Sequence, residues 1–126
     1  MNSRVLFDTG ALIALERRRQ RICKIHRMAV GSGLDVVAPT PVIAEWWRDG
    51  RSEKERRRLL RTLLQEPPDG HIARLAGSAI GRVGASVVDA LVMAAASIRS
   101  DTVYTSDVDD LERLLEIFPD VRVEPV

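Results

Sequence analysis

The segment RVLFDTG, residues 4–10, constrains the fold more than any other part of this sequence. Its apolar letters VLF predict a short buried strand, and the ALIALE that follows Gly10 predicts a helix. Asp8 therefore stands where a strand passes into a helix. In an open parallel sheet that position faces the crevice where ligands bind, so Asp8 is a candidate functional residue.

Short apolar segments alternate with helical segments along the rest of the chain. Strands are expected at residues 35–38, 102–105 and 121–124, and helices at 19–30, 52–65, 72–80, 87–97 and 107–117, the 72–80 helix with an extended lead-in. A further helix is expected to be capped by Thr40 and ended by Asp49 and Gly50. This alternation predicts an α/β fold, a single domain over residues 1–126, with a mostly parallel central sheet flanked by helices in an α/β/α arrangement.

The composition is that of a soluble globular protein. The chain has 126 residues, 45% hydrophobic and 29% charged, which suits one domain. Cys23 is its single cysteine, which excludes an internal disulfide and a cysteine-rich zinc site and favours a cytoplasmic location. No secretory signal is visible, and the apolar run at 90–96 is too short to cross a membrane.

The net charge of +1 conceals an uneven distribution. Basic residues crowd segments 17–27 and 48–61, whereas acidic residues dominate 101–124. Such asymmetry is typical of polyanion-binding proteins, and Arg56, Arg57 and Arg58 are candidate RNA contacts. Two alternatives remain open: these arginines pair with nearby acids on a solvated face, or they bind an acidic peptide of a partner.

Further acids stand near the starts of predicted helices. Glu45, Asp89 and Asp107 share this placement with Asp8, so all four can face one crevice. Each has a structural alternative, since acids in a first helical turn are favourable and Ser86 before Asp89 resembles a capping box. Glu45 is harder to explain structurally because its neighbours are apolar.

A cluster of carboxylates is unfavourable without a cation, and oxygen ligands suit Mg²⁺ or Mn²⁺. Such a site can activate water and stabilise the leaving oxygen of a phosphodiester. We therefore take Asp8, Glu45, Asp89 and Asp107 as the catalytic candidates. Asp8 and Asp89 are the main expected metal ligands, with Glu45, Asp107 and Asp110 completing the site, and Thr9 and Ser106 are expected to support it through hydrogen bonds.

Four segments resemble the motifs of the PIN-domain family in the family's order. VLFDTGALIAL at 5–15 resembles its opening, and APTPVIAEWW at 38–47 resembles its second acidic segment. VVDALVMAAA at 87–96 and VYTSDVDDL at 103–111 resemble the third and fourth. The length suits the VapC-type toxins of type II toxin–antitoxin systems. Asp110 fits the family's last acid, although the adjacent Asp109 leaves that position ambiguous.

This resemblance implies a PIN-like domain acting as an Mg²⁺- or Mn²⁺-dependent endoribonuclease on structured RNA such as tRNA. It also implies a homodimer and a cognate antitoxin protein. The alternative is a non-catalytic PIN-like module that binds RNA or a partner. A receiver or phosphatase fits less well, because Asp8-Thr9-Gly10 lacks the second acid that those families carry at this strand end.

Overall fold

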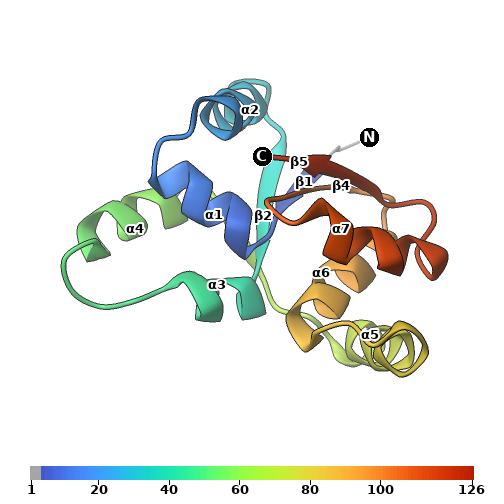
Figure 1. The fold of residues 1–126 in the computed structure, drawn as a ribbon. Helices are drawn as coiled ribbons and strands as arrows, with labels where there is room; N and C mark the ends of the chain where they lie inside the picture. Colours follow the sequence, from blue (N-terminus) through green and yellow to red (C-terminus); the bar gives the residue numbers. More distant parts are fainter. Residues whose placement is uncertain (1–3) are drawn as a thin grey trace.

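A five-stranded parallel sheet forms the centre of the computed structural model, which describes residues 4–126. The strands are β1 (Arg4–Phe7), β2 (Asp35–Pro39), β3 (Leu64–Glu66), β4 (Thr102–Thr105) and β5 (Arg122–Pro125), in the order β3-β2-β1-β4-β5. Every neighbouring pair is parallel, which confirms the predicted sheet type (Figure 1). The predicted domain, 1–126, begins three residues outside this range.

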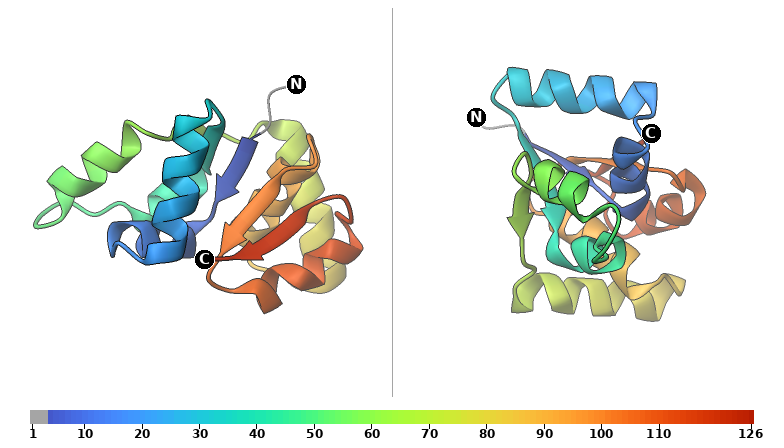
Figure 2. Two further views of the ribbon diagram at one scale, coloured as in Figure 1. Left: turned by 90° about the horizontal axis from the view of Figure 1, so that it is seen from above. Right: turned by 90° about the vertical axis from the view of Figure 1, so that its left-hand side faces the viewer.

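Helices cover both faces of the sheet. They are α1 (Thr9–Glu16), α2 (Gln20–Gly31), α3 (Thr40–Trp46), α4 (Glu53–Leu60), α5 (Gly70–Val83), α6 (Val87–Ser97) and α7 (Val108–Glu112), followed by a 3₁₀ turn, Arg113–Glu116. Figure 2 shows α2 and α5 on opposite sides of the sheet, so the predicted α/β/α layering is confirmed. No helix among residues 4–126 has both the length and the apolar character needed to traverse a lipid bilayer.

The core lies between the central strands and the helices that pack on them. Leu6 and Phe7 of β1 and Val103 of β4 are fully buried. Helix α6, predicted at 87–97, buries the side chains of residues 92–94 completely. Its small alanine side chains allow close packing against β4 and α5.

Several predicted boundaries are wrong. The helix expected over 52–65 ends at Leu60, and Leu64–Glu66 forms the unpredicted edge strand β3. Three residues are too few to show strand periodicity, so pairing with β2 decides the conformation. The expected extended lead-in to residues 72–80 is absent, because the Asp69 side chain caps α5 at Gly70. Thr40 is the first residue of α3, and its side chain makes no cap bond.

The strand order creates a switch point between β1 and β4. The chain runs from β1 outward to β2 and β3, then returns to pair β4 on the other side of β1. The loops that follow β1 and β4 therefore diverge at the carboxyl ends of these two strands. In open α/β sheets, ligands usually bind at such a point. Asp8 continues the pairing there, since its backbone N–H donates to the carbonyl oxygen of Tyr104 at 3.2 Å.

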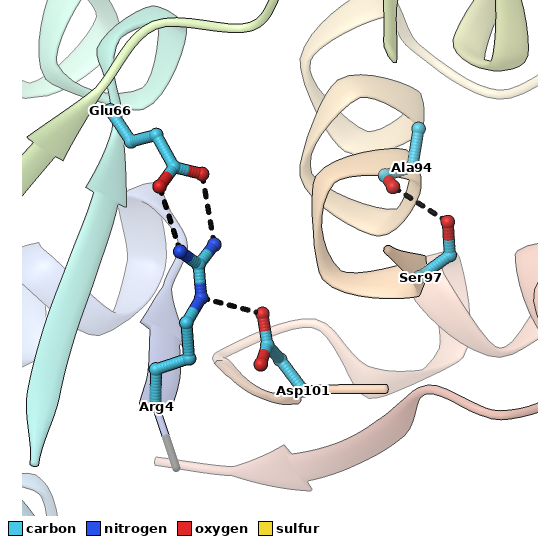
Figure 3. Close-up of polar contacts among 5 residues, drawn as sticks. All are labelled: Arg4, Glu66, Ala94, Ser97 and Asp101. Atoms are coloured by element: carbon cyan, nitrogen blue, oxygen red, sulfur yellow. Dashed lines mark hydrogen bonds and ion pairs between the residues drawn. The ribbon is translucent and has the colours of Figure 1, made fainter. Parts of the chain in front are cut away.

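A buried ion network ties the strands together elsewhere in the sheet (Figure 3). The Arg4 guanidinium donates twice to the Glu66 carboxylate, at 2.7 and 2.9 Å, and once to Asp101 at 2.9 Å. The side chains of Arg4 and Asp101 are only 4% and 3% exposed. This one cation therefore links β1, the end of β3 and the residue that precedes β4.

Candidate active site

Asp8 is a buried carboxylate at the switch point, 9% exposed. Its Oδ1 accepts a hydrogen bond from the Ala11 backbone N–H at 2.9 Å, so it caps α1 directly after the carboxyl end of β1. Burial raises the pKa of Asp8 to about 6, and the negative charge of Asp89 raises it further, against hydrogen bonds from Thr105, Ala11 and Gly10. Asp8 thus caps α1, and its raised pKa keeps it a candidate for a functional role.

Asp89 lies among the other candidate acids. Its backbone N–H donates to Ser86 Oγ at 3.1 Å, so the predicted cap on α6 is present. Burial raises the pKa of the Asp89 carboxyl, and the charges of Glu45 and Asp107 raise it further. The same carboxylate also acts on the pKa of Asp8. Asp89 is therefore electrostatically coupled to acids from three other segments of the chain.

Glu45 and Asp107 are exposed at the rim of this cluster. Thr9 Oγ1 donates to Glu45 Oε1 at 2.5 Å, which joins α1 to α3 and gives Thr9 a supporting contact as predicted. The Asp107 side chain caps α7, accepting from the Asp110 backbone N–H at 3.4 Å. Both acids therefore make a hydrogen bond of their own and also act on the pKa of Asp89.

The neighbouring residues Asp109 and Asp110 differ in their surroundings. A hydrogen bond with Asp107 raises the pKa of the Asp110 carboxyl, as do the charges of Asp107 and Asp89. Asp109 has no side-chain contact with the cluster among the hydrogen bonds and ion pairs of the described residues. The structure therefore brings Asp110, and not Asp109, to the acidic cluster.

Two residues of this site escaped the sequence interpretation. Thr105 is fully buried at the end of β4; its hydroxyl hydrogen-bonds the Asp8 carboxylate and accepts from the Asp107 backbone N–H at 2.9 Å. Arg113 lies close enough to lower the pKa of both Asp89 and Asp110. Placement at a strand end was a usable signal for Thr105, whereas no local pattern distinguishes Arg113.

The donor set fits a hard divalent cation, since it consists of carboxylates and hydroxyls with no histidine or thiol. Burial and mutual repulsion already raise the pKa of Asp8 and Asp89, and a bound cation would relieve both effects. As the side chains of residues 4–126 stand, no group of three or more His, Cys, Asp or Glu is close enough together to hold a metal ion. The oxygen chemistry fits Mg²⁺ or Mn²⁺, and binding requires the carboxylates to draw together.

The arginines proposed from sequence for RNA binding are engaged in α4. Arg56 donates to Glu16 Oε1 at 3.0 Å, and its guanidinium lies over the Trp46 ring. Arg57 pairs with Glu53 and Arg58 with Glu55 through exposed i,i+4 and i,i+3 bridges. The alternative of pairing with local acids is therefore present, and RNA contact by Arg56, Arg57 and Arg58, which is untested, would require these pairs to separate.

Gly10 holds α1 against the β4–α7 loop. A Cβ at this position would lie 1.9 Å from Ser106 Oγ and 2.7 Å from Ser106 Cβ. Real carbon atoms do not approach so closely, so only glycine allows this contact. Ser106 therefore packs closely on Gly10, and its predicted supporting hydrogen bonds stay a prediction.

We expect Gly10→Ala to destabilise the protein by about 1–3 kcal/mol, because the new methyl group forces the Ser106 backbone away. Urea unfolding would measure this change. Gly77→Ala is the matched control: it also lies in a helix, has no atom within 4 Å of a Cβ, and should stabilise the protein by up to about 1 kcal/mol. Adding Ser106→Gly to Gly10→Ala should restore part of the lost stability. Equal stabilities of the Gly10→Ala and Gly77→Ala proteins would contradict the steric contact.

We expect Asp8→Asn to stabilise the metal-free protein near neutral pH. The folded pKa of Asp8, about 6, exceeds the ordinary 3.8, so its stabilising contribution is complete below pH 3.8 and is lost as pH rises through about 6. Asparagine keeps the cap without the charge. The pKa lies about two units above 3.8 and each unit is worth about 1.4 kcal/mol, so the gain at pH 7 is about 3 kcal/mol. Thermal unfolding in EDTA at pH 4 and pH 7 checks the prediction, and a gain of equal size at both pH values would contradict it.

Comparison with known proteins identifies the fold through structure alone. Neither the models of known protein families nor the curated proteins match this sequence. Solved structures do match over almost the whole chain. The complex VapBC2 from Rickettsia felis, bound to a DNA fragment from its promoter, contains a chain with 12% identity and a TM-score of 0.75, covering 97% of this chain and 98% of that one.

Two further structures give the same result. DNA-bound VapBC from Salmonella typhimurium matches at 15% identity and a TM-score of 0.73, with 98% of each chain covered. FitAcB from Neisseria gonorrhoeae matches at 20% identity and a TM-score of 0.66, covering 94% of this chain and 95% of that one. At these identities the likeness establishes the fold, which is the PIN-like fold that the four motifs predicted.

Proposed function

We propose that this chain, which has the PIN-like fold of VapC-type toxins, is the ribonuclease toxin of a toxin–antitoxin pair. The observation that supports the activity is that acids from four separate segments lie near enough to the β1–β4 switch point to act on one another's pKa, although not near enough to hold a metal ion as they stand. Capping alone explains Asp8 and Asp107 one at a time, but not why Asp89 is coupled to Asp8, Glu45 and Asp107 together. A carboxylate set of this kind suits phosphodiester hydrolysis.

In this proposal the carboxylates of Asp8, Glu45, Asp89, Asp107 and Asp110 hold Mg²⁺ or Mn²⁺. An ion held there would supply Lewis acidity and would lower the pKa of a water molecule near neutral pH. Asp8 is oriented by the bond from the Ala11 backbone N–H and is buried, while Glu45, Asp107 and Asp110 are exposed and accessible to RNA. The Thr9 hydroxyl orients Glu45 within this set.

The partner we propose is an antitoxin protein that blocks this site, because the similar structures are described as toxin–antitoxin or VapBC complexes. A cytoplasmic homodimer acting on structured RNA such as tRNA completes the proposal. The resemblance of the sequence motifs to the VapC branch supports each of these points.

Cleavage of a labelled total-tRNA pool tests the activity. The protein is denatured and refolded to remove any antitoxin, then assayed with Mg²⁺, with Mn²⁺ and with EDTA. Discrete cuts that require metal are expected. A Mg²⁺ titration by calorimetry on the same samples separates the outcomes: Asp8→Asn should lose most of the metal affinity. Metal binding without cleavage of any RNA would favour the alternative, a non-catalytic RNA- or partner-binding module.

A further inference from the structure

The arginines of segment 17–21, at the corner between α1 and α2, line two different hollows of the surface. Arg18 adopts a left-handed conformation, with φ 58°, between the last turn of α1 and the start of α2. Arg17, Arg19 and Arg21, the corner arginines, line a hollow of about 630 Å³ together with Gly10 and Ser106. Arg18 instead lines a separate cleft with His26, Arg27 and Arg58. The first hollow therefore begins at two residues of the candidate site.

A second, smaller hollow continues this surface on the other side of α1. It measures about 240 Å³ and is lined by Glu45, Trp46 and Arg48, among others. Ile13 and Arg17 line both hollows, so the two adjoin along α1. One continuous surface thus runs from Ser106, past Arg17, to the candidate catalytic Glu45.

The charges along this surface are available for an external anion. Within residues 4–126, none of the corner arginines forms an ion pair with an acidic side chain, and all three are exposed. Arg21 makes a single contact, from Nε to the carbonyl oxygen of Pro125 at 3.0 Å. The acid Glu16, which lines the smaller hollow, is already bonded to Trp46 and Arg56. The corner therefore differs from α4, whose arginines each have a carboxylate partner.

We propose that an RNA strand enters the acidic site along the α1–α2 corner, with its phosphates held by Arg17, Arg19 and Arg21. This inference rests on the proposed ribonuclease function and names the residues that would deliver its substrate. A polyanion approaching a carboxylate cluster needs unpaired cations beside it, and the corner supplies them where the surface meets Gly10 and Ser106. Ile13, 36% exposed between the two hollows, offers an apolar surface against which a base can pack.

Single-stranded RNA suits this surface better than an acidic peptide of a protein partner. The two hollows adjoin along one helix, which offers a path for a single backbone, and the smaller one is lined by Glu45, one of the acids proposed to cut the RNA. An acidic peptide would bring carboxylates towards Glu45 without the reactive phosphodiester that the site requires. The peptide is therefore treated as the competing outcome in the test.

Fluorescence anisotropy tests the proposal with a labelled single-stranded RNA of roughly a dozen nucleotides. All proteins carry Asp89→Asn, so the RNA is bound and not cut. Arg17→Gln/Arg19→Gln is compared with Arg57→Gln/Arg58→Gln, which removes the same charge from α4. The corner pair is expected to weaken RNA binding at least about tenfold at low salt and to reduce the slope of log affinity against log salt by about 1.4, whereas the α4 pair changes affinity less than about twofold.

A conservative variant and a second ligand make the result decisive. Arg17→Lys/Arg19→Lys keeps both charges and should retain most RNA affinity, which separates phosphate binding from misfolding. Equal losses in the corner and α4 pairs, or a larger loss in the α4 pair, would overturn the proposal. So would a corner variant that keeps its RNA affinity but loses affinity for a poly-glutamate peptide, because that surface would then bind protein.

Failure of this inference and failure of the ribonuclease proposal give different results. The binding assay uses a variant that does not cut, so it reports the RNA path without any catalysis. Selective loss of RNA binding in the corner pair, together with no cleavage by the wild type in metal, would leave the path standing and remove the nuclease. Metal-dependent cleavage that the corner substitutions leave unaffected would support the nuclease and remove the proposed RNA path.

Discussion

Asp89→Asn is expected to lower the rate of RNA cleavage about a thousandfold or more. A metal site supplies several kcal/mol of transition-state stabilisation, and each ~1.4 kcal/mol lost is a tenfold change in rate. Asp89 is the most connected of the acids, since its charge acts on Asp8 and Asp110 and it responds to Glu45 and Asp107. Single-turnover cleavage of a tRNA that the wild type cuts measures the loss.

Two controls separate this effect from a loss of the fold. Asp109→Asn removes the same charge from a neighbouring exposed acid outside the cluster and should leave the rate within about twofold. The Asp89→Asn protein itself should melt no lower than wild type, because burial already disfavours its charged form and Ser86 still caps α6. Equal rates for the Asp89 and Asp109 variants would mean that the acidic cluster does not carry the chemistry.

Arg4→Met is expected to destabilise the protein by about 3–5 kcal/mol, the usual cost of removing one partner from a buried ion pair. Methionine leaves Asp101, whose side chain is 3% exposed, without a cation, and it leaves Glu66 without its bidentate donor. Hydrogen bonding to Glu66 and Asp101 raises the pKa of Arg4, so the guanidinium is charged throughout the folded range. Urea unfolding at pH 7 measures the loss.

Arg57→Met is the matched surface control, because its pair with Glu53 is 60% and 33% exposed, and it should cost less than about 1 kcal/mol. Combining Arg4→Met with Asp101→Asn should recover part of the loss by removing the unpaired charge. The deficit of the single variant should also shrink as pH falls and Asp101 becomes protonated, since burial raises the pKa of that carboxyl. A deficit no larger than that of Arg57→Met would show that the network adds nothing beyond a surface pair.

The sequence predicted those elements that have a strong local pattern. Helix α6 was expected at 87–97 and is found there, because alanine and apolar residues over three turns leave few alternatives. The strands at 4–7 and 102–105 are likewise recovered in full. By contrast, β3 has only three residues and no buried face of its own, so its conformation comes from pairing with β2.

Asp8, Asp89 and Asp107 could be named from sequence because each follows a strand or opens a helix. Glu45 was also expected near a helix start, but it is the next-to-last residue of α3, because that helix ends at Trp46. The meeting of these acids could not be predicted locally, since it depends on β1 pairing with β4 across almost the whole chain. Because these segments are far apart in the sequence, local patterns do not reveal that Thr105 acts on Asp8. For the same reason they do not show whether Asp109 or Asp110 joins the acidic cluster. Only the folded arrangement separates those two neighbours.

The sequence shows which segments are rich in arginine, whereas the tertiary contacts decide which of these arginines have a carboxylate partner. The runs at 17–21 and 56–58 look alike in sequence, yet the second finds carboxylate partners in its own helix and on α1, while the first lies beside the acidic site. Charged residues are usually exposed, whereas Arg4 is buried between two acids that are distant from it in sequence. Periodicity and end signals are properties of neighbouring residues, so the sequence by itself determined most of the helices and strands. Strand order, ion partners and the site depend on contacts between distant residues, and these only the tertiary structure decides.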